Sequence, residues 1–249
     1  MGERTSYTPG TFSYAELATS DAAAAQAFYS AIFGWTYEEI PMGDDAPPYF
    51  PVHLDGKQVA ALFTSDQPPH WNSYVTVESA DAAAARAAEL GASLIVEPFD
   101  VMELGRMAVI ADPSGGVLSL WEPRQHIGSE FVNAPGALAW NDLVTPDPEA
   151  GKRFYGDLFG WTFQEMSGEY TVIRNGDRSN GGIFANPDAP QAAWLPYFGI
   201  GDLDALLARI DELGGRVFMG PVDVPAGRFV VLTDPQGAMF AVLTGDYDD

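Results

Sequence analysis

The sequence contains no cysteine, which excludes disulfide bonds, thiolate nucleophiles and cysteine-ligated metal sites. Basic residues are scarce, because 12 Lys and Arg stand against 35 Asp and Glu, for a formal net charge of −23. A field of that sign repels phosphate backbones and anionic lipid, so nucleic acids and membrane surfaces are poor partners. No apolar run reaches membrane-spanning length and no signal-peptide pattern opens the chain, so we expect a cytoplasmic protein.

The most informative feature that the chain does have is an internal repeat. Residues 16–35 (ELATSDAAAAQAFYSAIFGW) return as residues 142–161 (DLVTPDPEAGKRFYGDLFGW), with nine of twenty positions identical. Residues 105–116 (GRMAVIADPSGG) return as residues 227–238 (GRFVVLTDPQGA). A repeat of this length is a whole domain. We therefore predict two tandem modules, residues 1–123 and 137–249, joined by a linker over residues 124–136.

Each module divides again into two similar units. Asp caps the free N–H groups of a first helical turn and Gly stops a helix, which predicts helices over residues 21–34, 81–91, 147–160 and 202–214. Short alternating segments flank these helices in the first module, over residues 12–17, 36–40, 49–54, 58–64, 74–78, 93–97, 106–111 and 117–121. The unit is therefore strand–helix–strand–strand–strand, twice in each module.

The repeated motifs are typical of packing and turns. Phe28, Tyr29, Phe33 and Trp35 have the spacing of one helix face and its exit, which favours a core role. Asp112-Pro113 and Asp234-Pro235 have the chemistry of a turn into a final strand.

These motifs, FYSAIFGW and FYGDLFGW with Asp-Pro-x-Gly before each last strand, resemble those of the vicinal-oxygen-chelate superfamily. That family includes glyoxalase I, bleomycin-resistance proteins, fosfomycin-resistance enzymes and extradiol dioxygenases, and the likeness is to its tandem two-module bacterial type. The resemblance implies an α+β fold, with two glyoxalase-like modules each built from two βαβββ units whose curved mixed sheets form cups. It implies little about the reaction, because one fold hosts many chemistries.

Metal-dependent members of the family hold one divalent ion in a cup, through a set of two His (or Gln) and two Glu. The ligand positions that the resemblance implies fall on Tyr14, Asn72, Ser119, Trp140, Leu195 and Ala241. The stretches for the remaining Glu, residues 58–64 and 180–186, contain neither carboxylate nor His. Trp, Leu and Ala cannot coordinate, and isolated Tyr, Ser or Asn bind divalent ions weakly. We therefore predict neither a metal nor another cofactor.

The three histidines show no metal-ligand spacing and are expected on the surface or in loops: His53, His70 and His126.

Side chains two apart on a strand share a face, so residues near each ligand position should line the cups. The residues expected to face the cups are Phe12, Tyr14, Glu16, Asn72, Ser119 and Trp121 in the first, with Leu138, Trp140, Asp142, Ala241 and Leu243 in the second. The residues expected at the rims are Tyr74, Trp194 and Tyr197. Glu16 and Asp142 could hold a ligand, act as a general base, or form a structural pair with Arg106 and Arg228.

An aromatic pocket with few polar groups suits a flat organic molecule, and the acidic surface suits a cationic one. The sequence thus predicts metal-independent binding of a small aromatic or cationic molecule, with ligand contacts from Tyr14, Glu16, Asn72, Tyr74, Ser119, Trp140, Asp142, Trp194 and Tyr197. Two alternatives stay open: a glyoxalase-like lyase or isomerase with Glu16 or Asp142 as base, and a metal-dependent lyase or dioxygenase. The chain is expected to be a monomer or a homodimer, and the cups could form within or between modules.

Overall fold

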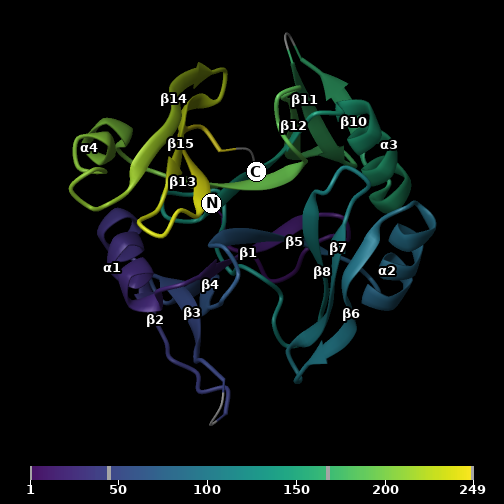
Figure 1. Cartoon of the computed structure of the whole chain (residues 1–249), viewed down its shortest axis with the longest axis horizontal. Coiled ribbons are helices and arrows are strands. Elements are labelled where there is room, and N and C mark those ends of the chain that lie inside the picture. Colours follow the sequence, from purple (N-terminus) through teal and green to yellow (C-terminus); the bar gives the residue numbers. More distant parts are fainter. Residues whose placement is uncertain (1, 44–45, 167–168, 248–249) are drawn as a thin grey trace.

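The computed structural model describes residues 2–43, 46–166 and 169–247 and consists of two eight-stranded mixed sheets flanked by helices (Figure 1). The strands of the first sheet are β1 (Phe12–Thr19), β2 (Thr36–Tyr37), β3 (Tyr49–Leu54), β4 (Lys57–Thr64), β5 (His70–Thr76), β6 (Ser93–Val101), β7 (Gly105–Ala111) and β8 (Val117–Pro123). Those of the second are β9 (Leu138–Thr145), β10 (Thr162–Glu165), β11 (Tyr170–Asn175), β12 (Arg178–Ala185), β13 (Ala193–Gly199), β14 (Arg216–Val224), β15 (Gly227–Thr233) and β16 (Met239–Gly245).

Each sheet is built from one module only. The first has the strand order β2-β3-β4-β1-β5-β8-β7-β6 and the second has the equivalent order β10-β11-β12-β9-β13-β16-β15-β14. Two βαβββ units therefore join through the antiparallel pairs β1–β5 and β9–β13. The α+β prediction is confirmed, and each cup forms within a module.

The helices are α1 (Ala22–Phe33), α2 (Ala80–Glu89), α3 (Pro148–Phe159) and α4 (Leu203–Leu207). Asp21 and Asp147 cap α1 and α3 as predicted, through hydrogen bonds from Ala24 N and Ala150 N. The cap of α2 is Ser79 rather than Asp81, and α4 is only five residues long. None of the helices described is long and apolar enough to cross a membrane.

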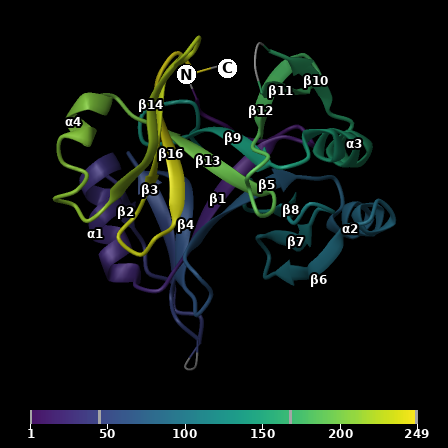
Figure 2. The same ribbon diagram turned by 45° about the horizontal axis from the view of Figure 1, so that its top comes forward.

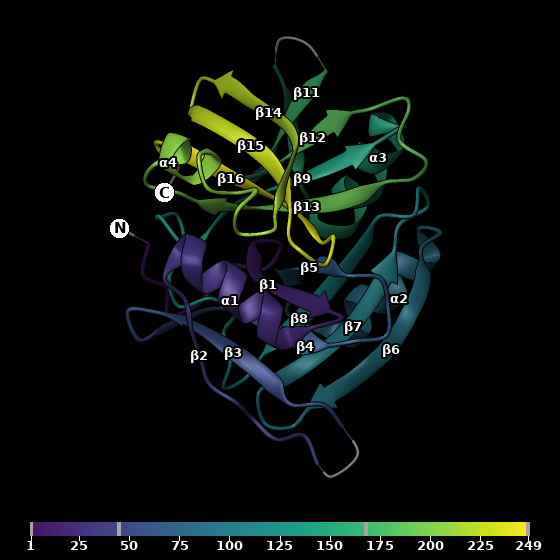
Figure 3. The ribbon, with the colours of Figure 1, turned by 60° about the vertical axis from the view of Figure 1, so that its left-hand side comes forward.

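The helices pack across the boundary between modules. In Figures 1 and 2, α1 lies beside α4 and α2 beside α3, and Figure 3 shows α1 at the junction of the two modules. One core joins α1 and the β1–β3–β4 side of the first sheet to α4 and strands β13, β15 and β16 of the second. The other core joins α2 and β5–β7–β8 to α3 and β9, β11 and β12. Each βαβββ unit thus buries its helix against a unit of the other module.

The repeated motifs form reciprocal links at this boundary. The Tyr29 hydroxyl donates to Asp234 Oδ2 at 3.1 Å, and its counterpart Tyr155 donates to Asp112 Oδ2 at 2.8 Å. The other oxygen of each Asp accepts backbone N–H bonds in the turn that follows, such as Gly116 N to Asp112 Oδ1 at 3.0 Å. The aromatic motif of one module therefore holds the Asp-Pro turn of the other.

Candidate functional site

The first cup holds a carboxylate surrounded by tyrosines. Glu16 on β1 accepts a hydrogen bond from the Tyr74 hydroxyl at 2.6 Å, and the Tyr49 hydroxyl also hydrogen-bonds to it. Tyr14 lies on the same face, where its hydroxyl accepts a 2.8 Å bond from the Gln58 side-chain amide. Burial raises the pKa of Glu16, and the two tyrosine hydrogen bonds partly offset that rise.

The second cup repeats this arrangement around Asp142. Its Oδ2 accepts from the Tyr197 hydroxyl at 2.7 Å, and its Oδ1 accepts from the Tyr170 hydroxyl at 2.8 Å and from the Trp140 indole N–H at 2.9 Å. Asp142 is 5% exposed, and this burial raises its pKa against the lowering effect of its three hydrogen bonds. We call Glu16, Tyr49 and Tyr74, and equally Asp142, Tyr170 and Tyr197, the carboxylate–tyrosine clusters.

The shorter acid of the second cluster lies closer to the backbone and requires a glycine beside it. Asp142 pairs with Gly182 on the parallel strand β12, whereas Glu16 pairs with Ala61 on β4. A Cβ on Gly182 would overlap the Tyr170 hydroxyl and Asp142 Oδ1. The change from Glu to Asp and the change from Ala to Gly are therefore one coupled adjustment.

The linker covers the first cup. The ring of His126 meets the rings of Tyr14 and Trp121 edge to face, with centroid distances of 4.9 and 5.7 Å. The Trp121 indole donates to the His126 carbonyl oxygen at 2.9 Å. Tyr14, Tyr74 and Trp121 are each 5% exposed or less. His126 lies in a loop, as expected, and this loop folds into the cup, so the imidazole ring is half-buried rather than on the open surface.

The second cup borders a cavity of about 380 Å³, which we call the arm cavity because the N-terminal arm, residues 4–12, forms one wall. Trp140 lines this cavity and also donates to Asp142, so one indole belongs to both the cavity and the cluster. The sixteen residues that line the arm cavity are Arg4, Ser6, Tyr7, Thr8, Thr11, Phe12, Val132, Asn133, Leu138, Ala139, Trp140, Asn141, Asn175, Arg178, Ser179 and Asn180.

Two asparagines fasten the arm to the second module. Asn175 Nδ2 donates to the Pro9 carbonyl at 3.0 Å, and Asn180 Nδ2 donates to the Gly10 carbonyl at 2.9 Å. Asn180 Oδ1 also accepts from Phe12 N at 3.3 Å. Hydrogen bonds of the fold itself thus hold the wall that the arm provides.

Two residues expected in the cups face the core instead, for one reason. Phe12 pairs with Val75 while Tyr14 pairs with Tyr74, so β1 carries an extra residue between them. The same bulge separates Leu138 from Trp140 on β9. An extra residue reverses the inward and outward alternation. Phe12 consequently packs on Trp161 and Trp194, and Leu138 joins the core around α1.

Other expected positions divide between cup and core. Strand register places Asn72 beside Glu16 and places Ser119 beside Tyr74, on the face of the first cup. Trp194 is wrong as a rim residue, because it is 7% exposed and donates to the Tyr155 hydroxyl in the core.

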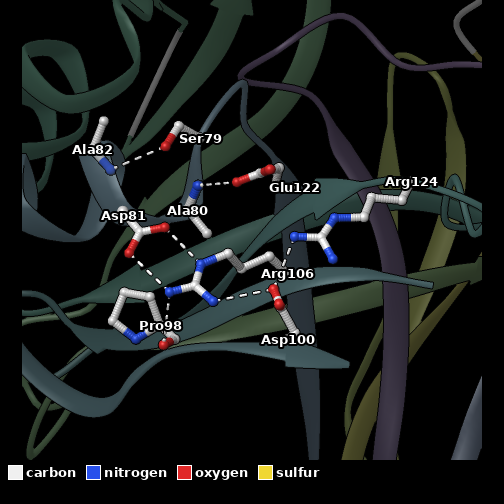
Figure 4. Close-up of polar contacts among 9 residues, drawn as sticks. All are labelled: Ser79, Ala80, Asp81, Ala82, Pro98, Asp100, Arg106, Glu122 and Arg124. Carbon is white, nitrogen blue, oxygen red and sulfur yellow. Dashed lines mark hydrogen bonds and ion pairs between the residues drawn. The ribbon is translucent and has the colours of Figure 1, made fainter. Parts of the chain in front are cut away.

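The suggestion that Arg106 and Arg228 pair with the cup carboxylates is also wrong. Arg106 binds Asp81 at 2.6 Å and Asp100 at 3.1 Å at the α2 end of the first sheet (Figure 4). Arg228 binds Asp204 and Asp223. The cup carboxylates are satisfied by hydroxyl and indole donors instead, which leaves them without a cationic neighbour of this kind.

The residues at the implied metal positions do not fit a divalent ion. Tyr14 hydrogen-bonds to Gln58, Trp140 donates its N–H to Asp142, and Leu195 and Ala241 belong to an apolar cluster. Within the described residues, no group of three or more His, Asp or Glu side chains comes together. A divalent ion prefers several carboxylate or imidazole ligands, which these side chains do not offer.

The sequence reasoning missed two residues of the clusters, Tyr49 and Tyr170. Each is the first residue of the second strand after the helix, β3 or β11, and each hydrogen-bonds to the carboxylate of its cup. In the structure the last residues of these strands, Leu54 and Asn175, are equivalent, and each tyrosine lies five residues before its own. The Asp55-Gly56 and Asn175-Gly176 dipeptides are out of step by one residue with this equivalence, so the sequence does not align the two tyrosines.

Two family models match the chain, a glyoxalase-like domain over residues 15–121 and the glyoxalase/bleomycin resistance protein/dioxygenase superfamily over residues 137–242. The relative named "Putative glyoxylase CFP32" from Mycobacterium bovis is 37% identical over 256 residues, covering 98% of both chains. The anthracycline biosynthesis protein DnrV of Streptomyces peucetius is 33% identical over 261 residues, covering 96% of this chain and 94% of its own.

Solved structures share the fold at low sequence identity. The Mn(II)-bound glyoxalase from Novosphingobium aromaticivorans has a TM-score of 0.69 at 16% identity, covering 100% of this chain and 84% of its own. The 2,3-dioxygenase LapB from Pseudomonas sp. KL28 has a TM-score of 0.64 at 15% identity, covering 98% and 95%.

Proposed function

Because the chain belongs to the glyoxalase/bleomycin resistance protein/dioxygenase superfamily, we propose that it binds a small organic molecule, without a metal ion, at the second cup. The observation that carries this proposal is the position of Trp140, which lines the arm cavity and donates to the buried Asp142. A cavity of about 380 Å³ is within the range of small-molecule sites.

The proposed ligand has a flat aromatic part. Trp140 and Tyr7 are the partly exposed aromatic residues of the lining, whereas the Phe12 ring packs on Trp161 and Trp194. Relatives named for anthracycline biosynthesis agree with this chemistry, because anthracyclines contain planar fused rings. The first cup contributes less, since His126 and the linker already cover its aromatic residues.

A second function is a metal-independent lyase or isomerase, favoured by the raised pKa of Asp142 and by the relative named as a glyoxylase. In this reaction Asp142 takes a proton from the carbon beside a carbonyl group. The electron pair of the C–H bond forms a double bond to the carbonyl carbon, and the π pair of the C=O bond moves to the carbonyl oxygen. A nearby tyrosine hydroxyl donates to that oxygen as charge develops. The three hydrogen bonds that already bind the carboxylate weaken it as a base.

The duplication provides matched variants for the test. Binding of naphthalenemethanol, a neutral aromatic probe, is measured by ligand-observed NMR and calorimetry in the intact chain. Trp140→Leu should weaken binding by at least about tenfold, equivalent to about 1.4 kcal/mol. Tyr14→Leu, which removes the aromatic ring at the equivalent position of the first cup, should leave the affinity unchanged. Equal losses from both variants, or retention of affinity in Trp140→Leu, would refute the assignment to the second cup.

The enzyme alternative and the metal question have separate readouts. Exchange of the carbon-bound hydrogens of naphthylacetone in D₂O measures general-base activity, which Asp142→Asn should lower by about 10²–10⁴ if Asp142 is the base. Without such activity the rate of hydrogen exchange equals the rate in buffer alone.

A metal bound at a hundredfold excess over its dissociation constant would stabilise the fold by about 2.7 kcal/mol. We expect no shift of the melting temperature with Zn²⁺, Mn²⁺ or Fe²⁺.

A further inference from the structure

The lining of the arm cavity has the opposite charge from the rest of the molecule. The chain has 35 acidic residues among 249, which predicts about two in a set of sixteen, but the sixteen lining residues include neither Asp nor Glu. They do include two of the 12 basic residues, Arg4 and Arg178. The acids adjacent in sequence, Glu3 and Asp177, lie outside the lining.

The two arginines come from opposite walls. Arg4 belongs to the N-terminal arm and Arg178 begins β12, which follows the hairpin turn of the second module. Among the described residues neither takes part in an ion pair, and the Arg4 guanidinium donates a 3.2 Å hydrogen bond to the Glu3 carbonyl oxygen. Two like charges in one cavity lining repel each other, and an anion between them would remove that cost.

The remaining polar groups of the lining are suited to an oxyanion. Ser6, Thr8 and Ser179 carry hydroxyl groups that can donate to a carboxylate, and they lie on the same two walls as the arginines. Hydrogen bonds from Asn175 and Asn180 to the arm keep these walls at a fixed separation. The site therefore does not have to be assembled by its ligand, which lowers the cost of binding.

We infer that the ligand of the arm cavity is an organic anion, a carboxylate attached to a flat aromatic group, with the carboxylate between Arg4 and Arg178 and the ring against Trp140. This inference rests on the proposed function and narrows its ligand class. The overall charge of −23 repels such a molecule at long range, so its retention depends on these local donors. A cationic ligand would instead meet two arginines without a carboxylate partner in the lining.

The test compares three probes that share a naphthalene ring and differ in charge: naphthoate, naphthalenemethanol and naphthylmethylamine. Affinity for the intact chain should follow the order anion, neutral, cation, and only the affinity for naphthoate should fall as salt is raised. Arg4→Gln and Arg178→Gln should each weaken naphthoate binding about tenfold, because hydrogen bonds to charged groups are lost, and should leave naphthalenemethanol unchanged. Arg178→Lys should recover part of the loss.

Arg153→Gln is the matched control. Arg153 is exposed on α3 and outside the lining, so the variant makes the same change in net charge without changing the cavity. A loss of naphthoate affinity equal to that of Arg178→Gln would mean that only the overall field matters, and would overturn the inference. Binding of the neutral or cationic probe at least as tightly as naphthoate overturns the inference while the proposed function stands. If all three probes fail to bind at millimolar concentrations, both are overturned.

Discussion

Protonation of His126 should weaken the fold in a narrow pH range. Burial in the first cup lowers the pKa of His126 to about 4 from an ordinary value of 6.5. The imidazole Nε2 is buried without a hydrogen-bond partner among the described residues, and the ring lies against Tyr14 and Trp121. Charging this ring would place a cation where water is excluded.

The direction of the stability change with pH follows from the lowered pKa of His126. A group with a lower pKa in the folded state than in the unfolded state stabilises fully above the unfolded value, and this contribution is lost as pH falls toward the folded value. The difference between 6.5 and about 4 limits the loss to about 3.4 kcal/mol. Between pH 7 and pH 5, linkage gives a loss of about 2 kcal/mol.

The assay is urea unfolding at about pH 7, 6 and 5, followed by circular dichroism. The intact chain should lose about 2 kcal/mol of unfolding free energy relative to His126→Leu, which does not titrate. The control His70→Leu removes an exposed imidazole at the start of β5 and should follow the intact chain. A difference between the intact chain and His126→Leu that stays constant over this range would refute the assigned burial of the neutral ring.

Three further predictions concern the core and the second cluster. Tyr29→Phe and Tyr155→Phe should each lower the unfolding free energy by about 1–3 kcal/mol in urea, because Asp234 and Asp112 lose a buried donor; Tyr37→Phe, at a weaker 3.4 Å bond, is the control. Gly182→Ala should lower the unfolding free energy by about 1–3 kcal/mol, since the added Cβ would overlap the Tyr170 hydroxyl. The control Ala61→Gly, at the equivalent position of the first cup, should leave the Glu16 cluster unchanged in NMR spectra. Burial raises the pKa of Asp142, so the stability that its protonated form contributes is lost as pH rises from the ordinary carboxyl range through this raised pKa. The intact chain should therefore lose stability relative to Asp142→Asn as pH rises, and a parallel pH dependence of the two would contradict this.

Much of the fold could be predicted because its boundaries use local chemistry. The Asp caps of α1 and α3 and their closing glycines act within one turn, so the residues alone reveal them. The packing of α1 on the other module could not be read in this way. The aromatic spacing of Tyr29 and Phe33 shows that a face is buried but does not show which surface buries it.

The site was predictable only up to the first irregularity of each strand. Alternation correctly related Tyr14 to Glu16 and Trp140 to Asp142, since no bulge lies between them. It failed at Phe12 and Leu138, because one extra residue reverses the faces and leaves no mark in hydrophobicity. Alternation alone would have placed Trp194 in the core, because its neighbour Leu195 faces the cup and adjacent residues on a strand face opposite sides.

The differences between the two clusters explain why one cup and not the other is assigned to a ligand. In the first, Tyr14 accepts from Gln58, and the linker places His126 over the aromatic wall. In the second, Trp140 directs its N–H inward to Asp142, while Ser179, at the position equivalent to Gln58, lines the arm cavity and accepts from Arg174. The indole N–H is therefore satisfied inside the cup, and Trp140 remains partly exposed in the cavity lining. A duplicated fold can thus keep one cluster covered while the other borders a cavity. The equivalent residues Tyr14 and Trp140 differ in this respect, because Tyr14 is covered by His126 and Trp140 lines the arm cavity.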